Sequence, residues 1–175
     1  MPTRSRTLAP ALAVVLCGGL LAACASGDAS GAAEPSASDE GGTPTGSTGY
    51  PLTLDNCGTE VTFDAAPERV VTIKSSTAET MLALGLGDRI VGAAFLDGPV
   101  PDSLADAAAG TAVADPFSDE VPGSEATLAL EPDLVYAGWE SNLTADGAGD
   151  RGTLASLGVA SYVSPAACKA PEYMP

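Results

Sequence analysis

The chain has 175 residues, about the length of one domain of ordinary size, and its 7 basic and 23 acidic residues give a formal net charge of −16 at pH 7. Such an acidic chain repels phosphate groups, which argues against nucleic-acid binding and against membrane attachment through a basic patch. It has no histidine, which excludes histidine-dependent catalytic triads and histidine-rich metal sites.

The amino terminus predicts a secreted lipoprotein. Arg4 and Arg6 precede the mostly apolar segment Leu8–Leu21, which is the layout of a signal peptide at residues 1–23. Leu21-Ala22-Ala23-Cys24 resembles a lipobox, which implies cleavage before Cys24, acylation of its thiol and anchoring at the extracytoplasmic face of the cell membrane. The alternative is an ordinary secreted protein with a chance cysteine.

Residues 24–49 predict a flexible linker after the lipidated cysteine. They are mostly Ala, Ser, Gly, Thr, Pro and acidic residues, without an aromatic side chain. Such a segment cannot bury enough apolar surface to fold. The folded part is therefore expected at residues 50–175.

Strand and helix patterns alternate through the folded part. Two short strands are expected around Asn56-Cys57-Gly58, and further strands at Arg69–Ile73, Ile90–Ala94, Leu134–Ala137 and Val159–Val163. Helices are expected from Ser76 to about Leu84, around Ser103–Ala109, from Ser124 to Pro132, and from about Thr153 to Leu157. This alternation predicts an α/β fold: one Rossmann-like lobe with a parallel sheet of βα units, preceded by a β-hairpin.

Local signals predict where the helices begin and end. Ser76 with Glu79 three residues later fits a capping box, and Ser124 is a candidate cap for a second helix. Gly85 and Gly158 are expected to end the helices before them.

Polar residues at one strand-to-helix junction predict an anion site. Ser75, Ser76 and Thr77 stand where a strand ends and a helix begins, so their hydroxyls and backbone N–H groups could receive a phosphate or carboxylate. The alternative is that these hydroxyls only cap the helix.

Two aromatic residues also follow strands. Phe95 and Trp139 could stack on a planar ligand ring, although core packing is the alternative for both. Asp97, Glu140 and Asn142 could supply polar contacts to ligand hydroxyls, with a solvated surface position as the alternative for each. No nucleophile is paired with a base, so we expect no enzymatic activity.

Three ordered motifs carry a family resemblance. The run from Ser124 to Val135, S-E-x-x-L-x-L-x-P-D-L-V, resembles the end of the first lobe in the substrate-binding proteins of iron-siderophore, haem and cobalamin ABC importers. Before it, Ala66–Thr72 and Glu79–Gly85 resemble the P-x-R-V-V strand and the E-x-x-x-x-L-G helix of the same superfamily. The resemblance covers about residues 50–175.

Shorter segments resemble one branch of that superfamily. Lys74–Thr77, Ala94–Pro101 and Tyr136–Asn142 are similar to lipoproteins assigned to uptake of the deazaflavin precursor of coenzyme F-420. The resemblance implies a monomeric binding protein without a cofactor, which delivers a small ligand to a permease with a cytoplasmic ATPase. The alternatives are an iron-siderophore, haem or cobalamin ligand, or a truncated surface lipoprotein that binds nothing.

The resemblance also implies a docking residue. Glu125 falls on the position of an exposed glutamate that, in the superfamily, enters an arginine pocket of the permease. The alternative is a carboxylate that merely stabilises the first turn of its helix. Family members have two lobes joined by a long helix, whereas this sequence stops at Pro175, so the second lobe is expected to be absent and binding to be weak.

The cysteines separate by compartment. Cys17 leaves with the signal peptide and Cys24 would be lipidated, which leaves Cys57 and Cys168 in an oxidising environment. The resembling branch also holds two cysteines in these places. We therefore expect a disulfide between Cys57 and Cys168, with two free thiols as the alternative.

Overall fold

The computed structural model describes residues 48–170 and residue 172. The predicted signal peptide, Cys24 and nearly all of the predicted linker lie outside these residues. No helix within the described part of the chain is long and apolar enough to span a bilayer.

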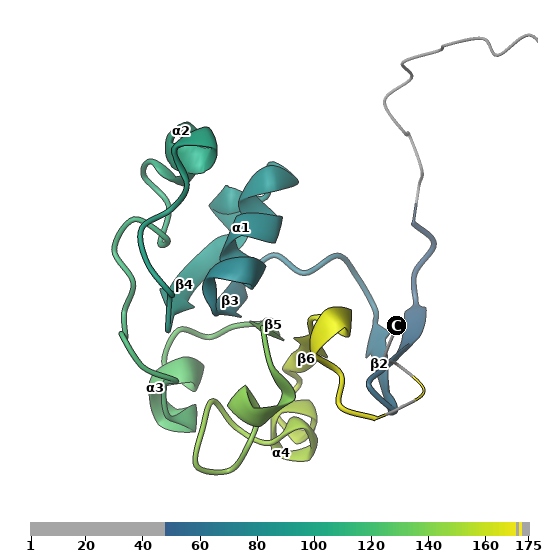
Figure 1. The fold of residues 1–175 in the computed structure, drawn as a ribbon. Coiled ribbons are helices and arrows are strands. Elements are labelled where there is room, and N and C mark those ends of the chain that lie inside the picture. Colours follow the sequence, from purple (N-terminus) through teal and green to yellow (C-terminus); the bar gives the residue numbers. More distant parts are fainter. Residues whose placement is uncertain (1–47, 171, 173–175) are drawn as a thin grey trace, which may run out of the picture. The chain divides into compact units, whose positions relative to one another are not determined.

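Short strands and helices alternate along the described residues (Figure 1). The strands are β1 (Leu52–Asn56), β2 (Thr59–Phe63), β3 (Val70–Ile73), β4 (Ile90–Ala94), β5 (Leu134–Ala137) and β6 (Ala160–Val163). The α-helices are α1 (Ser75–Ala83), α2 (Ala105–Ala108), α3 (Ser124–Leu128) and α4 (Arg151–Ser156). Single 3-10 turns are η1 (Gly87–Arg89), η2 (Asp102–Leu104), η3 (Glu140–Asn142) and η4 (Pro165–Ala167).

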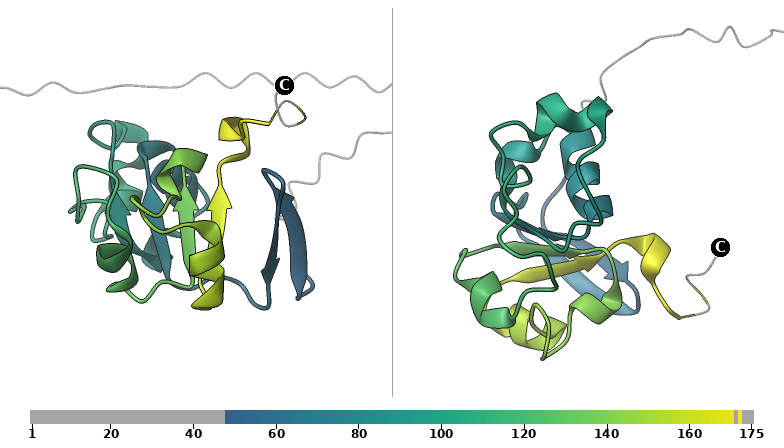
Figure 2. Two further views of the ribbon diagram at one scale, coloured as in Figure 1. Left: turned by 90° about the horizontal axis from the view of Figure 1, so that it is seen from below. Right: turned by 60° about the vertical axis from the view of Figure 1, so that its left-hand side comes forward.

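The main sheet is parallel and has the strand order β4-β3-β5-β6. The chain runs from β3 through α1 to β4 on one side, and then returns to place β5 on the other side of β3. This reversal makes the boundary between β3 and β5 a topological switch point, where open α/β sheets leave a crevice at the carboxyl ends of the strands. Figure 2 shows α1 and α2 on one face of the sheet and α3 and α4 on the other.

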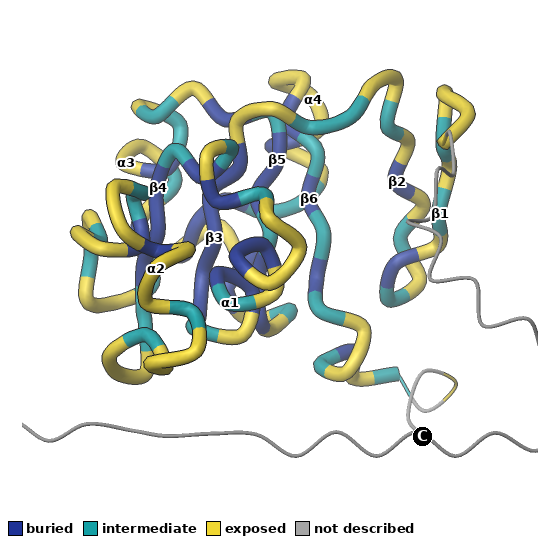
Figure 3. The backbone as a smooth tube through the Cα atoms, turned by 90° about the horizontal axis from the view of Figure 1, so that it is seen from above, coloured by how far each residue is buried: buried dark blue, intermediate teal, exposed yellow. Residues whose placement is uncertain are grey.

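The sheet separates two apolar cores. Every residue of β3 is buried, as expected of a central strand that is covered on both faces (Figure 3). Val70, Met81, Leu82 and Ile90 belong to the core beneath α1 and α2. The opposite core contains Val71, Ile73, Val135, Leu143, Leu154 and Val163. The predicted α/β fold with a parallel sheet is confirmed.

The first helix begins earlier than the capping box predicts. Its N-cap is Lys74 and makes no side-chain capping bond, so the predicted capping box of Ser76 and Glu79 is wrong. The β3 strand turns into the helix directly at Lys74, where the backbone has a φ of 89°. The predicted stop at Gly85 is confirmed, because this residue has a φ of 71° and its N–H donates to the carbonyl of Leu82.

The other helix starts also differ. Ser124 is the first residue of α3 after the N-cap Gly123, and no side-chain cap is formed, because glycine has no side chain. The Thr127 hydroxyl donates to the Gly123 carbonyl. Helix α4 begins at Arg151 rather than at Thr153, since Asp150 caps it by accepting from the Thr153 N–H at 2.9 Å. Periodicity alone missed this cap inside a polar loop.

The predicted hairpin β1–β2 turns at Cys57 and Gly58, whose φ values of 56° and 76° suit a tight two-residue turn. Asn56 joins the hairpin to edge strand β6, because its side chain donates to the Val163 carbonyl and accepts from the Val163 N–H, both at 2.8 Å. Cys57 is bridged to Cys168 with a Cα–Cα distance of 5.1 Å, which confirms the predicted disulfide.

Candidate functional site

The carboxyl ends of three adjacent strands bring four side chains together. Lys74 follows β3, Phe95 and Asp97 follow β4, and Trp139 follows β5 after one glycine. We call these four residues the Lys74 cluster. It lies at the switch point of the sheet, the position where open α/β folds bind their ligands.

Lys74 is the centre of the cluster. Its ammonium nitrogen lies 4.1 Å from the ring centroid of Trp139 and 4.5 Å from that of Phe95. Both distances are within cation–π range. The two rings meet edge to face, with centroids 6.1 Å apart and an interplanar angle of 79°. The ammonium also forms an ion pair with the Asp97 carboxylate.

The backbone of the cluster is unusual at two positions. Lys74 has a φ of 89° and Phe95 has a φ of 54°, conformations that non-glycine residues seldom adopt. Hydrogen bonds hold both residues, because Lys74 N–H donates to the Ala94 carbonyl and Phe95 N–H to the Ser118 carbonyl. Strain of this kind collects where side-chain direction matters for function.

Gly138 makes room for the lysine. A Cβ at this position would lie 2.7 Å from both Cβ and Cγ of Lys74, closer than such atoms approach in proteins. The stem of Lys74 therefore crosses the backbone of Gly138, which explains why the lysine can be 6% exposed at the end of a central strand.

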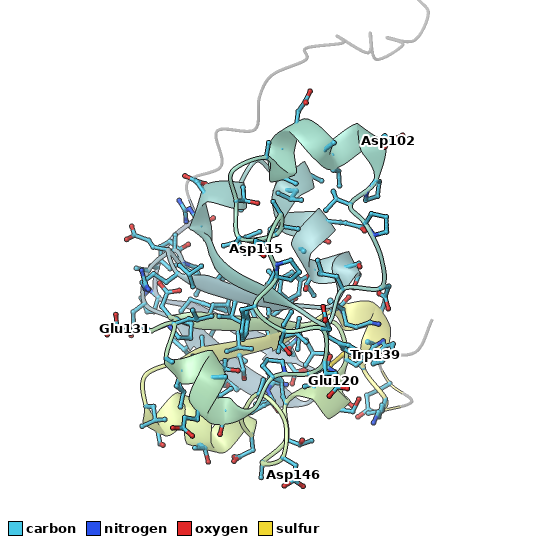
Figure 4. The ribbon with its side chains drawn as sticks, turned by 90° about the vertical axis from the view of Figure 1, so that its left-hand side faces the viewer. Asp102, Asp115, Glu120, Glu131, Trp139 and Asp146 are labelled. Atoms are coloured by element: carbon cyan, nitrogen blue, oxygen red, sulfur yellow. A yellow bond between two sulfur atoms is a disulfide. The ribbon has the colours of Figure 1, made fainter. Side chains whose placement is uncertain are left out.

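The members of the Lys74 cluster differ in solvent exposure. The Trp139 residue is 46% exposed, whereas the side chain of Lys74 is only 8% exposed. Figure 4 shows Trp139 and Glu131 at opposite edges of the described residues, consistent with their places after and before β5. The core-packing alternative is therefore wrong for Trp139, whose ring presents part of its surface to solvent.

The three hydroxyl residues predicted for an anion site, Ser75, Ser76 and Thr77, lie in different environments. The Ser75 Oγ accepts from the Asp97 N–H at 2.8 Å, so it ties the loop after β4 to α1. Ser76 is exposed. Thr77 is fully buried, and its hydroxyl donates to the carbonyls of Ile73 and Lys74. Of these three residues, only Ser75 and Ser76 have side chains that can contact a ligand near the Lys74 cluster.

The residues after Trp139 support its backbone. Asn142 is 2% exposed, so a solvated surface position is wrong for it, and its Oδ1 accepts from the Trp139 N–H at 3.0 Å. Glu140 is half-buried at the start of η3. Burial lowers the pKa of Arg151, and the Glu140 carboxylate acts against this shift by favouring the charged guanidinium.

Glu125 lies apart from these residues in sequence and in environment. It is exposed in the first turn of α3, where the positive end of the helix dipole favours a carboxylate. An exposed carboxylate is available to a protein partner, so the geometry is compatible with the predicted docking role.

A concave region lies away from the Lys74 cluster. A cavity of about 430 Å³ is bordered by β2, by the segment that leads from it to β3, and by the first residues of β6. Its arginine, Arg151, already donates to Asn56 and to Ser161. We give the cavity less weight than the Lys74 cluster because it lies at the amino-terminal edge of the sheet, away from the switch point. No group of three metal-ligating side chains occurs among the described residues.

Sequence patterns predicted Phe95, Asp97 and Trp139 for this site but missed Lys74. A lysine directly after the β-branched run Val70–Ile73, within a chain of few cations, is the available signal. This signal is weak, since lysine usually lies in solvent.

Comparisons with known proteins agree with this architecture. The chain is similar to the structure of a periplasmic binding protein from Veillonella parvula, with a TM-score of 0.59 and 26% identity over 69% of this chain and 39% of that one. It is also similar to the structure of an ABC-type Fe3+-hydroxamate transport system from Saccharomonospora viridis, with a TM-score of 0.52 and 31% identity over 70% of this chain and 42% of that one.

The sequence is also similar to that of a known binding protein. A cobalamin-binding protein from Halobacterium salinarum is 36% identical over 89 residues, which are 50% of this chain and 23% of that protein. No protein-family model matches the chain. The chain thus covers about a quarter of this curated relative and about two fifths of each structural neighbour.

Proposed function

We propose that residues 50–175 form the ligand-binding lobe of a substrate-binding protein for an ABC importer. The observation that carries this proposal is the Lys74 cluster, which places a cation and two aromatic rings at the switch point of the sheet. The similarity to a periplasmic binding protein and to an Fe3+-hydroxamate transport protein supports it. On this proposal the protein captures a small molecule and delivers it to a permease, without catalysis.

The deazaflavin precursor of coenzyme F-420 is our proposed ligand. Trp139 offers a partly exposed aromatic ring for stacking on a planar tricycle, and Ser75, Ser76 and Glu140 lie on the flanking segments with polar groups for its side chain. A ferric siderophore, haem or cobalamin is the alternative, supported by the names of the similar proteins.

Titration followed by tryptophan fluorescence tests the binding function. Trp139 is the chain's one tryptophan, so its emission reports directly on the proposed site. We expect saturable quenching by one compound among the deazaflavin precursor, a ferric hydroxamate, haem and cobalamin. Quenching by the deazaflavin precursor alone would support the finer proposal. The absence of saturable binding by all four compounds, in calorimetry as well, would refute the binding function.

Delivery requires a docking residue, and we propose Glu125 for this role. Its carboxylate is exposed on α3, where an arginine of the permease could form a charge-assisted, bidentate pair with it. Glu125→Ala should abolish stimulation of the importer ATPase and leave ligand affinity unchanged. Glu79→Ala, which removes a half-buried acid on α1, is the control. A loss of ligand affinity in Glu125→Ala would contradict the docking role.

We further propose that Cys24 anchors the protein outside the cell membrane through acyl chains. The Cys57–Cys168 disulfide supports an extracytoplasmic location, because such bonds persist in oxidising compartments. Cys24→Ser should move the protein from the membrane fraction to the soluble fraction. Retention of the variant in the membrane would contradict lipid anchoring at this residue.

A further inference from the structure

The Lys74 cluster contains its own counter-ion, and this arrangement indicates what the ligand carries. We infer that Asp97 occupies the position of an acid group of the ligand, and that a phosphate or carboxylate attached to a planar ring displaces it from Lys74. This inference rests on the proposed function as a small-molecule binding protein and is independent of the deazaflavin assignment, and it adds the charge and layout of the ligand.

The cation is buried, whereas its counter-ion is largely exposed to solvent. The side chain of Lys74 is 8% exposed, crosses Gly138 and is bounded by the rings of Phe95 and Trp139. The side chain of Asp97 is 58% exposed and stands on the loop that follows β4. The Asp97 carboxylate is already mostly solvated, so its release costs little desolvation, and a ligand anion that takes its place keeps the buried ammonium paired.

Replacement of the Asp97 carboxylate by a ligand anion would leave the loop after β4 in place. The backbone N–H of Asp97 donates to the Ser75 Oγ at 2.8 Å, which holds the loop independently of the Asp97 carboxylate. Rotation of the side chain alone would open one face of the ammonium to solvent. An incoming anion would then meet a desolvated cation, where a charge-assisted hydrogen bond is stronger than in water.

The geometry also relates the acid group to the ring. The ammonium lies 4.1 Å from the Trp139 centroid, and Trp139 is 46% exposed. A ligand ring stacked on the exposed part of the indole would therefore leave Lys74 within reach of an acid group carried on the ring or on a flexible chain attached to it. A neutral ring would gain the stacking contact but would leave Lys74 paired with Asp97.

Riboflavin and flavin mononucleotide form a matched pair of probes, because they share one tricyclic ring system and differ by one phosphate. Affinities are measured by calorimetry for the disulfide-bonded protein and three variants. Asp97→Asn removes the internal competitor, and Lys74→Met removes the cation but keeps an apolar stem. Asp146→Asn is the control, an exposed acid that Figure 4 shows apart from Trp139.

We expect the wild type and Asp146→Asn to bind flavin mononucleotide more tightly than riboflavin. Asp97→Asn should tighten flavin mononucleotide binding by about tenfold and leave riboflavin affinity unchanged, the factor that corresponds to one charge-assisted hydrogen bond. Lys74→Met should bring the two affinities together. Thermal unfolding of each variant confirms that it is folded.

Equal affinities of the wild type for the two flavins would overturn the inference. A preference for the phosphate that survives in Lys74→Met would also contradict it, as would weaker binding of flavin mononucleotide to Asp97→Asn than to the wild type. Failure of both flavins to bind would also overturn it. The proposed function would still stand if haem, cobalamin or a ferric hydroxamate bound saturably. If none of these compounds bound, the proposed function would fail as well.

Discussion

Gly138 should tolerate no side chain, because Lys74 occupies the space that a side chain would need. In Gly138→Ala the new Cβ would lie 2.7 Å from Cβ and Cγ of Lys74 and 3.2 Å from the Ile73 carbonyl oxygen. These neighbours belong to the stem of a buried residue and to the backbone of the central strand, so neither can move freely. Overpacking of this kind costs about 1–3 kcal/mol, and we expect about 2 kcal/mol here.

Urea unfolding at neutral pH measures this cost. Gly98→Ala is the matched control, because a Cβ there would meet nothing within 4 Å, and its stability should stay within about 0.5 kcal/mol of the wild type. The Gly138→Ala substitution should also shift the emission of Trp139, since displacement of Lys74 changes the charge next to the indole.

Making Gly138→Ala in a Lys74→Gly variant tests whether the collision with Lys74 causes the loss of stability. Lys74→Gly removes the two atoms with which the new Cβ would collide, and glycine also suits the backbone φ of 89° at this position. The Gly138→Ala substitution should therefore cost less than about 1 kcal/mol in the Lys74→Gly background. An equal cost in both backgrounds, or no cost in the wild type, would refute the proposed packing of Lys74 over Gly138.

Three further predictions address the disulfide, a helix cap and the aromatic platform. Replacing both Cys57 and Cys168 by serine should lower the free energy of unfolding by about 4 kcal/mol, because the bridge joins positions 111 residues apart, and unchanged urea unfolding would contradict this. The Thr153 hydroxyl and N–H lower the pKa of Asp150 from its ordinary value of 3.8, so this carboxylate stabilises the fold above that pH and loses its effect as the pH falls through the lowered pKa. Asp150→Ala should therefore lower the melting temperature at pH 7, and the difference from the wild type should vanish in strong acid; a constant difference would exclude the ionised cap. Trp139→Ala should weaken ligand binding in calorimetry by about 1–3 kcal/mol, whereas Tyr50→Ala, a control of similar exposure, should leave it unchanged.

The strands were predictable because their residue types match their surroundings. Val70–Ile73 and Leu134–Ala137 are short apolar runs, and central strands of a parallel sheet are buried on both faces. The helix starts were less predictable. Ser76 and Ser124 are good caps in isolation, yet the tertiary path of the chain puts Lys74 and Gly123 at the N-cap positions. Cap propensity is a local preference that the surrounding fold can override.

The aromatic and acidic members of the site were predictable from their places after strands, but the central cation was not. Lys74 becomes buried only because Gly138, distant in sequence, leaves space for its stem and because two rings and one carboxylate surround its ammonium. These partners come from the ends of two other strands, β4 and β5. Their juxtaposition depends on the strand order, which local patterns do not specify.

The location of a bound ligand tests the central claim most directly. A crystal structure of the protein with the compound that quenches Trp139 should place its ring against the exposed part of this indole, with a polar group beside Lys74. A ligand bound instead in the 430 Å³ cavity beside β2 and β6, with the Lys74 cluster unchanged, would contradict the account.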